Sequence, residues 1–359
     1  MEPNNLPVIT SAPAKIILFG EHGVNRQQPA LATAVNLRTT CLARRWEDGR
    51  YRLRAAERVE EGDLGEVHAF KRTVDGLRAA NALDQIRELA RDFFAPSRYV
   101  LAHVLEYTGD LGVEIVWRSA LPIGSGLGSG AAANTAMALA VTALAGQQAT
   151  PAEIVQMAWQ GDVIAHGGVA SSLDSSTAVY GGLIRYTTAA GAERLSIQAH
   201  LPLVIGDTLV QHNTAALNTH VRRWLEERPV RMQLFRDMGW LVRQAEAALQ
   251  RNDPATLGHL MNLHHLLQVK LGTSIPESEA LIEAALAAGA LGAKISGSGG
   301  GGVIIALADP ATGVEGQAAI AAAIDQAGGR SYIVTTGTEG ARLEPRPEDA
   351  RLWEQVTSQ

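Results

Sequence analysis

Hydrophobic and polar positions near the start of the chain alternate in the way that half-buried β-strands require. Residues 14–22 ("AKIILFGEH") contain a continuous apolar core, and residues 37–46 ("LRTTCLARRW") alternate, with β-branched residues among them. The Asp48-Gly49 dipeptide directly precedes residues 50–55 ("RYRLRA") and is a typical hairpin turn signal. The pattern therefore predicts that the first third of the chain consists mainly of strands.

The clearest helix boundaries lie around residue 150. Thr150 is a good N-cap, Pro151 suits the first helical position, and Glu153 completes a capping box. Gly167 can end this helix. Other helical patterns cover residues 55–95, 131–145, 218–269 with interruptions at Pro229 and Pro254, and 276–289. Strand patterns recur at residues 112–118, 181–188, 201–208, 293–296 and 303–309.

The length of the chain, 359 residues, exceeds what a single hydrophobic core usually supports, so we expect two domains. We place the boundary near residue 200, which gives domains of residues 1–200 and 201–359. Hydrophobic residues make up 46% and charged residues 19% of the chain, as in ordinary globular proteins.

The single cysteine, Cys41, rules out an internal disulfide and a cysteine-based metal cluster, and it favours the cytoplasm. The N-terminus has no basic stretch leading into an apolar one, so no secretory signal is expected. Residues 131–145 come nearest to a membrane span but contain polar residues. The net charge of −6 argues against a nucleic-acid partner, because such proteins usually carry a basic surface.

Two glycine clusters suggest close contact with a ligand. Residues 121–132 ("LPIGSGLGSGAA") place glycines directly before an alanine-rich helix, whose first N–H groups and positive dipole end favour an anion such as phosphate. A strand-to-helix turn without a ligand is the alternative. Neither a P-loop nor a dinucleotide fingerprint fits, because no lysine follows the loop and the acidic residue usual about 20 positions further on is missing. Residues 294–302 ("KISGSGGGG") form the second cluster, which is either another ligand contact or a plain loop.

Three charged residues are candidates for chemistry. Asp162 falls in the last turn of its predicted helix, where the dipole disfavours a carboxylate unless a cation or solvent compensates. Asp174 lies in a Ser/Gly-rich loop, where it is either catalytic or a turn residue bonding to its own backbone. Lys15 begins an apolar strand and alternatively marks a strand edge.

Taken together and in this order, residues 11–24, 121–132 and 294–302 resemble the three signature motifs of the GHMP kinases. Within that family the chain is most similar to the branch that phosphorylates mevalonate, on residues 159–182, 204–208 and 260–302. The similarity extends over nearly the whole chain; residues 45–110 and the C-terminal tail are the least diagnostic.

The resemblance implies an α+β, two-domain GHMP kinase fold, with an N-terminal α/β domain, a C-terminal ferredoxin-like α+β domain, and ATP between them. It implies ATP-dependent phosphorylation of the 5-hydroxyl of mevalonate, a small-molecule substrate, to give 5-phosphomevalonate and ADP. The alternatives are another alcohol or phosphomevalonate kinase and a diphosphomevalonate-type decarboxylase, whose members lack the lysine found here as Lys15. The oligomeric state is left open, and a homodimer is compatible with the resemblance.

The resemblance also assigns roles to individual residues. Asp174 matches the catalytic aspartate and Lys15 the motif-one lysine. Asp162 matches the acidic Mg²⁺ ligand, with Ser129 as a second metal ligand. Residues expected to hold the nucleotide are Gly124, Ser125, Gly126, Leu127, Gly128, Ser129, Gly130, Ala131, Gly297 and Ser298. Residues expected to contact the substrate are Lys15, Glu21, His22 and Asp174.

The chain departs from the family pattern at several positions. Asp162 stands where this branch usually has glutamate, and Gly130 replaces a serine that is normally a magnesium ligand. Ser129 or water is then expected to take that place. Ala14 replaces a glycine of the first motif, and the loop before Asp174 is one residue longer than expected, which bears on how the substrate fits.

Overall fold

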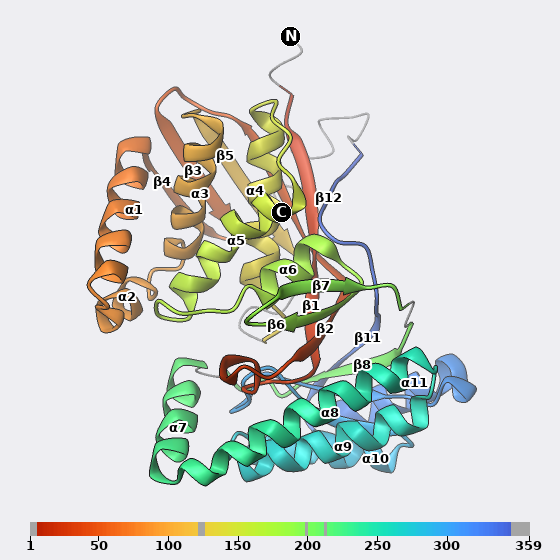
Figure 1. Cartoon of the computed structure of the whole chain (residues 1–359). Helices are drawn as coiled ribbons and strands as arrows, with labels where there is room; N and C mark the ends of the chain where they lie inside the picture. The colour runs from red at the N-terminus through yellow and green to blue at the C-terminus, as the bar shows by residue number, and fades with distance from the viewer. Residues whose placement is uncertain (1–5, 121–125, 198–199, 212–213, 346–359) are drawn as a thin grey trace.

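The computed structural model describes residues 6–120, 126–197, 200–211 and 214–345, and its two β-sheets organise the molecule (Figure 1). The larger sheet has eight strands in the order β12-β1-β2-β5-β3-β4, with β6 pairing with β2 and β7 pairing with β6. Its strands are β1 (Val8–Phe19), β2 (Ala30–Arg45), β3 (Arg50–Ala55), β4 (Arg58–Asp63), β5 (Val113–Ser119), β6 (Leu183–Thr187), β7 (Gly191–Leu195) and β12 (Arg342–Leu343).

The smaller sheet is antiparallel throughout and has the order β11-β8-β10-β9. Its strands are β8 (Pro202–Asp207), β9 (Gly292–Ser296), β10 (Val303–Leu307) and β11 (Arg330–Thr335). Every residue of β9 and β10 is buried, because helices pack around this sheet. Mixed helices and sheets in this arrangement agree with the predicted α+β class.

The helices are α1 (Leu64–Ala79), α2 (Leu83–Leu89), α3 (Ala95–Thr108), α4 (Ser129–Leu144), α5 (Pro151–Ala165), α6 (Leu173–Tyr180), α7 (Thr214–Glu227), α8 (Met232–Gln250), α9 (Pro254–Lys270), α10 (Pro276–Ala287) and α11 (Gly313–Gln326), with short 3-10 turns at η2 (Val24–Arg26), η3 (Pro229–Arg231) and η4 (Pro310–Thr312). Helix α4 packs on β1 and β2 and is flanked by α3 and α5. Helices α10 and α11 pack together on the smaller sheet, and α9 lies against β9.

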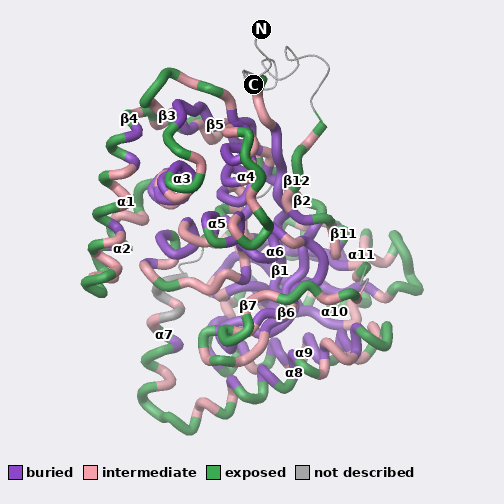
Figure 2. Tube along the Cα trace, turned by 45° about the horizontal axis from the view of Figure 1, so that its top comes forward, coloured by how far each residue is buried: buried purple, intermediate pink, exposed green. Residues whose placement is uncertain are grey.

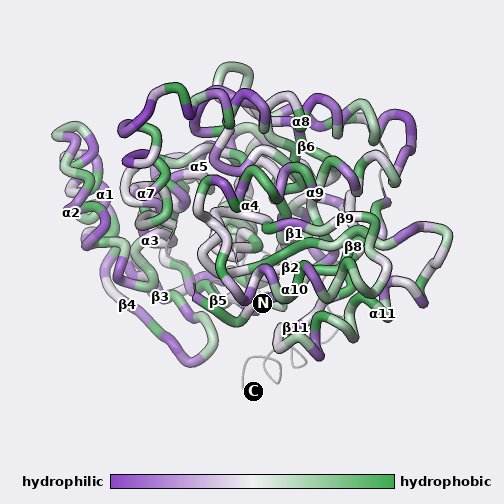
Figure 3. The backbone as a smooth tube through the Cα atoms, turned by 90° about the horizontal axis from the view of Figure 1, so that it is seen from below, coloured by the Kyte–Doolittle hydropathy of each residue, from purple (hydrophilic) through white to green (hydrophobic). Residues whose placement is uncertain are grey.

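The core follows from this layering. Helix α4 consists almost entirely of small buried residues, so it can lie close to the larger sheet, whereas α1 and α2 on the outside carry many exposed residues (Figure 2). Helix α8 alternates between hydrophobic and hydrophilic residues along its length (Figure 3), and its buried positions Phe235, Met238 and Val242 recur at helical spacing. None of the helices in the described part of the chain has the length and apolarity that crossing a membrane demands.

Most predicted elements are confirmed. Helix α5 begins as expected, because Thr150 accepts a hydrogen bond from the Glu153 N–H and the Glu153 side chain completes the capping box. Gly167 follows the helix with a positive φ of 74°. The interruptions expected at Pro229 and Pro254 separate α7, α8 and α9.

Two local predictions were wrong, and elements that had not been predicted occur as well. The Asp48-Gly49 turn does not join paired strands, because β5 lies between β2 and β3 and pairs with both. Strand β4 occupies the start of the region 55–95 that was expected to be helical, and strand β7 was not anticipated. In each case the position of a strand depends on partners that lie far away in the sequence.

The division of the chain near residue 200 stays a prediction. The first strand of the smaller sheet, β8, begins at Pro202. Strand β12 returns from the C-terminal region to pair with β1, with Leu343 opposite Thr10.

Candidate active site

Strand β1 carries Lys15 into the middle of the molecule. The pairing of β1 with β2 shifts register between Pro13 and Ala14, directly before this lysine. The Lys15 N–H donates to the Leu127 carbonyl at 3.0 Å, which ties the strand to the first glycine cluster. The side chain is buried, and its Nζ lies 3.1 Å from Oδ2 of Asp174. The interpretation of Lys15 as a marker of an exposed strand edge is therefore wrong.

Asp174 lies in the first turn of α6 rather than in a loop. This position favours a carboxylate, because the N-terminal end of a helix dipole is positive. The neighbouring Leu173 is buried in an apolar cluster that includes Ile17 and Val24, and this packing fixes the start of the helix. The Asp174 side chain remains 23% exposed, so its carboxylate pairs with Lys15 and is still accessible from the pocket.

The start of α4 offers backbone donors to the same region. Gly128 is the N-cap in a left-handed conformation with φ 74°, and no side chain caps the helix. The N–H groups of the first turn have no partner within the helix, so those of Ser129, Gly130 and Ala131 can donate to an anion. A Cβ on Gly128 would lie 2.9 Å from Cγ of Lys15, so the close approach of loop and lysine requires glycine.

Asp162, on α5, is 4% exposed, which contradicts the interpretation that solvent compensates its charge. Ser175 Oγ donates to its Oδ2 at 2.5 Å. Burial and the neighbouring negative charge of Asp174 raise the pKa of Asp162 to about 7. His166 lies one turn further on, and its Nδ1 donates to the Asp162 carbonyl at 2.8 Å. A cation placed between Asp162 and Asp174 would relieve their repulsion.

The turn after β1 supplies Glu21 and His22. His22 Nε2 donates to the Ser298 carbonyl at 2.8 Å, which connects the first motif to the second glycine cluster. Burial lowers the pKa of His22 to about 4, so its ring is neutral at physiological pH. The Glu21 carboxylate is buried and accepts from Lys294 Nζ. Burial raises the pKa of Glu21, and the charge of Lys294 opposes this rise.

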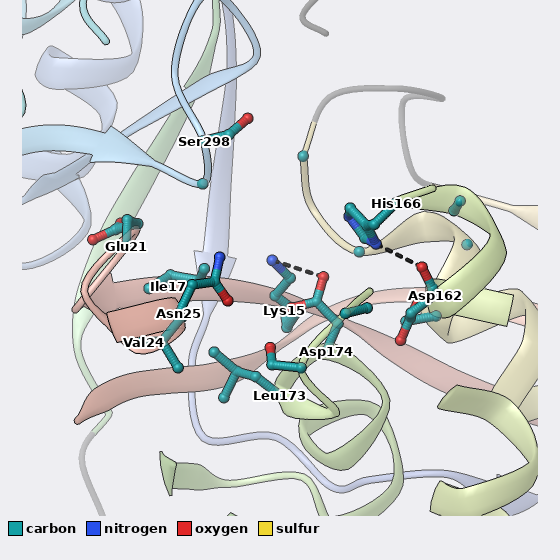
Figure 4. Close-up of a pocket in the computed structure, with 18 of the residues that line it drawn as sticks. Lys15, Ile17, Glu21, Val24, Asn25, Asp162, His166, Leu173, Asp174 and Ser298 are labelled. Carbon is teal, nitrogen blue, oxygen red and sulfur yellow. Dashed lines mark hydrogen bonds and ion pairs between the residues drawn. The ribbon is translucent and has the colours of Figure 1, made fainter. Parts of the chain in front are cut away.

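These residues surround one pocket of about 330 Å³ (Figure 4). The predicted site residues that line it are Lys15, Glu21, His22, Gly126, Gly128, Ser129, Gly130, Ala131, Asp162, Asp174, Gly297 and Ser298. Leu127 does not line the pocket; it is buried behind the loop and contributes the carbonyl that accepts from Lys15. Gly124 and Ser125 lie outside the described residues.

The structure adds residues that sequence reasoning missed. Asn25 and His166 line the pocket, Ser175 holds Asp162, and Lys294 holds Glu21. Asn25 directly follows residues 11–24, His166 and Ser175 lie within residues 159–182, and Lys294 opens the second glycine cluster. The sequence therefore indicated the segments in which these residues lie, but no sequence motif indicated which residues they contact.

The donor set fits a nucleotide phosphate and a magnesium ion. The backbone N–H groups of the first turn of α4 have no partner inside the helix, so they suit phosphate oxygens. No group of three or more Asp, Glu, His or Cys side chains that could hold a metal occurs among the residues the structure describes. Mg²⁺ is commonly held by one or two carboxylates together with substrate phosphates. Asp162 and Asp174 are the two carboxylates that line the pocket near this helix start.

Comparisons with known proteins agree with this arrangement. The family profile described as the GHMP kinases N terminal domain matches residues 97–182, and the profile described as GHMP kinases C terminal matches residues 245–326. The mevalonate kinase of Thermococcus sibiricus is 36% identical over 346 residues, covering 94% of this chain and 98% of the relative.

Solved structures show the same fold. A crystal structure of a mevalonate kinase superposes with a TM-score of 0.76 at 21% identity, covering 92% of this chain and 100% of the other. The L. major mevalonate kinase in complex with R-mevalonate superposes with a TM-score of 0.72 at 26% identity, covering 92% of this chain and 96% of the other.

Proposed function

This chain belongs to the GHMP kinases, within their mevalonate kinase branch, and on that premise we propose that it phosphorylates the 5-hydroxyl of mevalonate. The protein is a phosphotransferase with an alcohol acceptor, and ATP is its phosphate donor. The products of the proposed reaction are 5-phosphomevalonate and ADP. The relatives are mevalonate kinases, and the L. major protein is in complex with R-mevalonate, which supports mevalonate as the acceptor.

The observation that carries the proposal is the ion pair of Lys15 and Asp174 beside the open start of α4. An acceptor hydroxyl next to Asp174 can give up its proton to this carboxylate as its oxygen attacks the γ-phosphorus. The bond between the γ-phosphorus and the β–γ bridging oxygen then breaks, and ADP leaves. Lys15, 3.1 Å from Asp174, stabilises the charge that develops on the transferring group and holds the Asp174 carboxylate in position.

Nucleotide binding is assigned to the two glycine clusters. We propose that the backbone of residues 124–131, together with Gly297 and Ser298, holds the phosphates of ATP, and that Glu21 and His22 contribute to the acceptor side. We propose Asp162 and Ser129 as ligands of Mg²⁺. When bound, the ion would neutralise charge on the phosphate oxygens.

Outside the site, two further properties are proposed. The single cysteine, Cys41, is free and buried, which supports a cytoplasmic setting. A homodimer is also proposed, and light scattering on the purified chain tests it.

An ADP-release assay with mevalonate, phosphomevalonate, homoserine and galactose tests the acceptor. We expect turnover with mevalonate to exceed that with each of the others by at least about 100-fold in kcat/KM, as expected when an alternative acceptor leaves polar groups of a site unpaired. Preference for another acceptor in this panel would reject the assignment.

The catalytic role is tested by Asp174→Asn, which keeps the shape of the side chain but removes the base. We expect kcat to fall by about 10²–10⁴-fold, the range for general-base catalysis. Asp237→Asn on the exposed side of α8 is the matched control and should retain wild-type kcat. Survival of turnover within about threefold in Asp174→Asn would show that the assigned role is wrong.

A further inference from the structure

The Lys15–Asp174 pair divides the pocket into two ends. Figure 4 shows this pair between Asp162 and His166 on one side and Asn25 on the other. The first end faces the phosphate-binding start of α4. An acceptor whose hydroxyl lies at Asp174 therefore extends away from the phosphates, toward Asn25.

The end around Asn25 offers few groups that can donate a hydrogen bond. Ile17, Val24 and Leu173 are apolar, and Val24 and Leu173 pack in the same buried cluster. The Glu21 carboxylate is occupied by Lys294. His22 uses its Nε2–H on the Ser298 carbonyl, and its depressed pKa keeps the ring neutral.

Asn25 is different because its side chain lines the pocket, is exposed, and makes no hydrogen bond within the described part of the chain. In Figure 4 its amide group is directed toward Lys15. An amide has two N–H donors and no charge, so it can bind an anion without being repelled or requiring a counter-charge.

The backbone that carries Asn25 is held in place before any ligand binds. The Arg26 guanidinium donates to the His22 carbonyl at 2.8 Å, and Thr188 Oγ1 donates to the Val24 carbonyl at 3.0 Å. The Val24 side chain is buried, while the adjacent Asn25 side chain is exposed. The backbone of the 3-10 turn η2 is therefore fixed at Asn25, so only the side-chain torsions of Asn25 have to be ordered on binding.

We propose that Asn25 is a specificity-determining residue whose Nδ2–H donates to the carboxylate of the acceptor, at the end remote from the transferred hydroxyl. The proposal rests on the proposed function, because it assumes a carboxylated alcohol such as mevalonate. It explains how a chain of net charge −6, with Asp162 and Asp174 in the pocket, can bind an anionic acceptor at a site where Lys15 is engaged with Asp174.

The test compares Asn25→Asp with wild type on two acceptors. One acceptor is mevalonate, and the other is the triol in which its carboxylate is reduced to a hydroxymethyl group. The KM for mevalonate is expected to rise by about 10- to 100-fold, the range for losing a hydrogen bond to a charged group, with added repulsion between two anions. The apparent affinity for the triol should change by less than about threefold. The apparent affinity for the triol is measured as its KM. If transfer to the triol is slow, it is measured as the inhibition constant of the triol in competition with mevalonate.

Gln27→Glu is the matched control, because Gln27 is exposed two residues away, does not line the pocket, and receives the same charge. We expect wild-type KM values for both acceptors in this variant, and an unchanged KM for ATP and melting temperature in all three proteins.

Equal responses of mevalonate and the triol to Asn25→Asp would overturn the proposal, as would an equal effect of Gln27→Glu on mevalonate. An unchanged KM for mevalonate in Asn25→Asp would overturn it as well. Failure of the wild type to phosphorylate mevalonate would instead reject the proposed function, and with it the premise of this proposal.

Discussion

Replacing Gly128 with alanine tests whether the first glycine cluster exists to let Lys15 approach the helix start. Gly128 has φ 74°, and an added Cβ would lie 2.9 Å from Lys15 Cγ. Ordinary contacts begin at 3.4 Å, so Lys15 must move by about half an ångström, the difference between the two distances. Misplacing a reacting group by about 1 Å can cost about 100-fold in rate, so we expect kcat to fall by about 10-fold.

Backbone strain alone would also follow from this substitution and needs a separate control. Gly146, at the opposite end of α4, has φ 75° and no atom within 4 Å of its Cβ position. Alanine in the left-handed region costs about 1–2 kcal/mol at either glycine, so both variants should unfold at a similarly reduced temperature. Only Gly128→Ala should lose activity.

The assay is ADP release at saturating ATP, Mg²⁺ and mevalonate, with thermal unfolding measured on the same preparations. Equal kcat values for Gly128→Ala and Gly146→Ala would refute the reasoning, because the contact with Lys15 would then have no catalytic consequence. Loss of activity in both variants would show that strain at either end destabilises α4 as a whole, independently of the contact with Lys15.

Three further predictions concern buried charge and capping. Because the folded pKa of Asp162 is raised to about 7 from an ordinary value of 3.8, the folded state holds the extra proton between these values, and stability is lost as pH rises through this window. Between pH 4 and pH 8, the free energy of unfolding measured by urea titration should fall less for metal-free Asp162→Asn than for metal-free wild type. Equal pH dependence of the two proteins would contradict the raised pKa of Asp162. Lys294→Met should destabilise by about 3–5 kcal/mol by leaving Glu21 buried without its partner, whereas adding Glu21→Gln should recover much of the loss; equal stability of the single and double variants would exclude this pairing. Thr150→Ala should cost about 1 kcal/mol of stability by removing the cap of α5, with no change in KM for either substrate, and a melting temperature equal to that of wild type would show that the cap contributes nothing.

Signals that act over a few residues determined much of the architecture. Thr150 and Glu153 lie three residues apart, so their capping box could be predicted from the sequence and is confirmed. The glycines before α4 and the prolines between α7, α8 and α9 similarly act on their own neighbours. The resemblance of three motifs to the GHMP kinases then predicted the fold. Proteins that share these motifs in the same order share the long-range contacts of the family fold, which local patterns cannot reveal.

Tertiary structure decided which distant groups meet. The order of strands places β5 between β2 and β3, which no turn signal near Asp48 could determine. The contact of Lys15 with Asp174, the burial of Asp162 and the pairing of Glu21 with Lys294 all join separate elements. Pairings and pKa values of this kind depend on burial and on charges brought together by the whole fold, so the sequence could name candidate residues but not their partners.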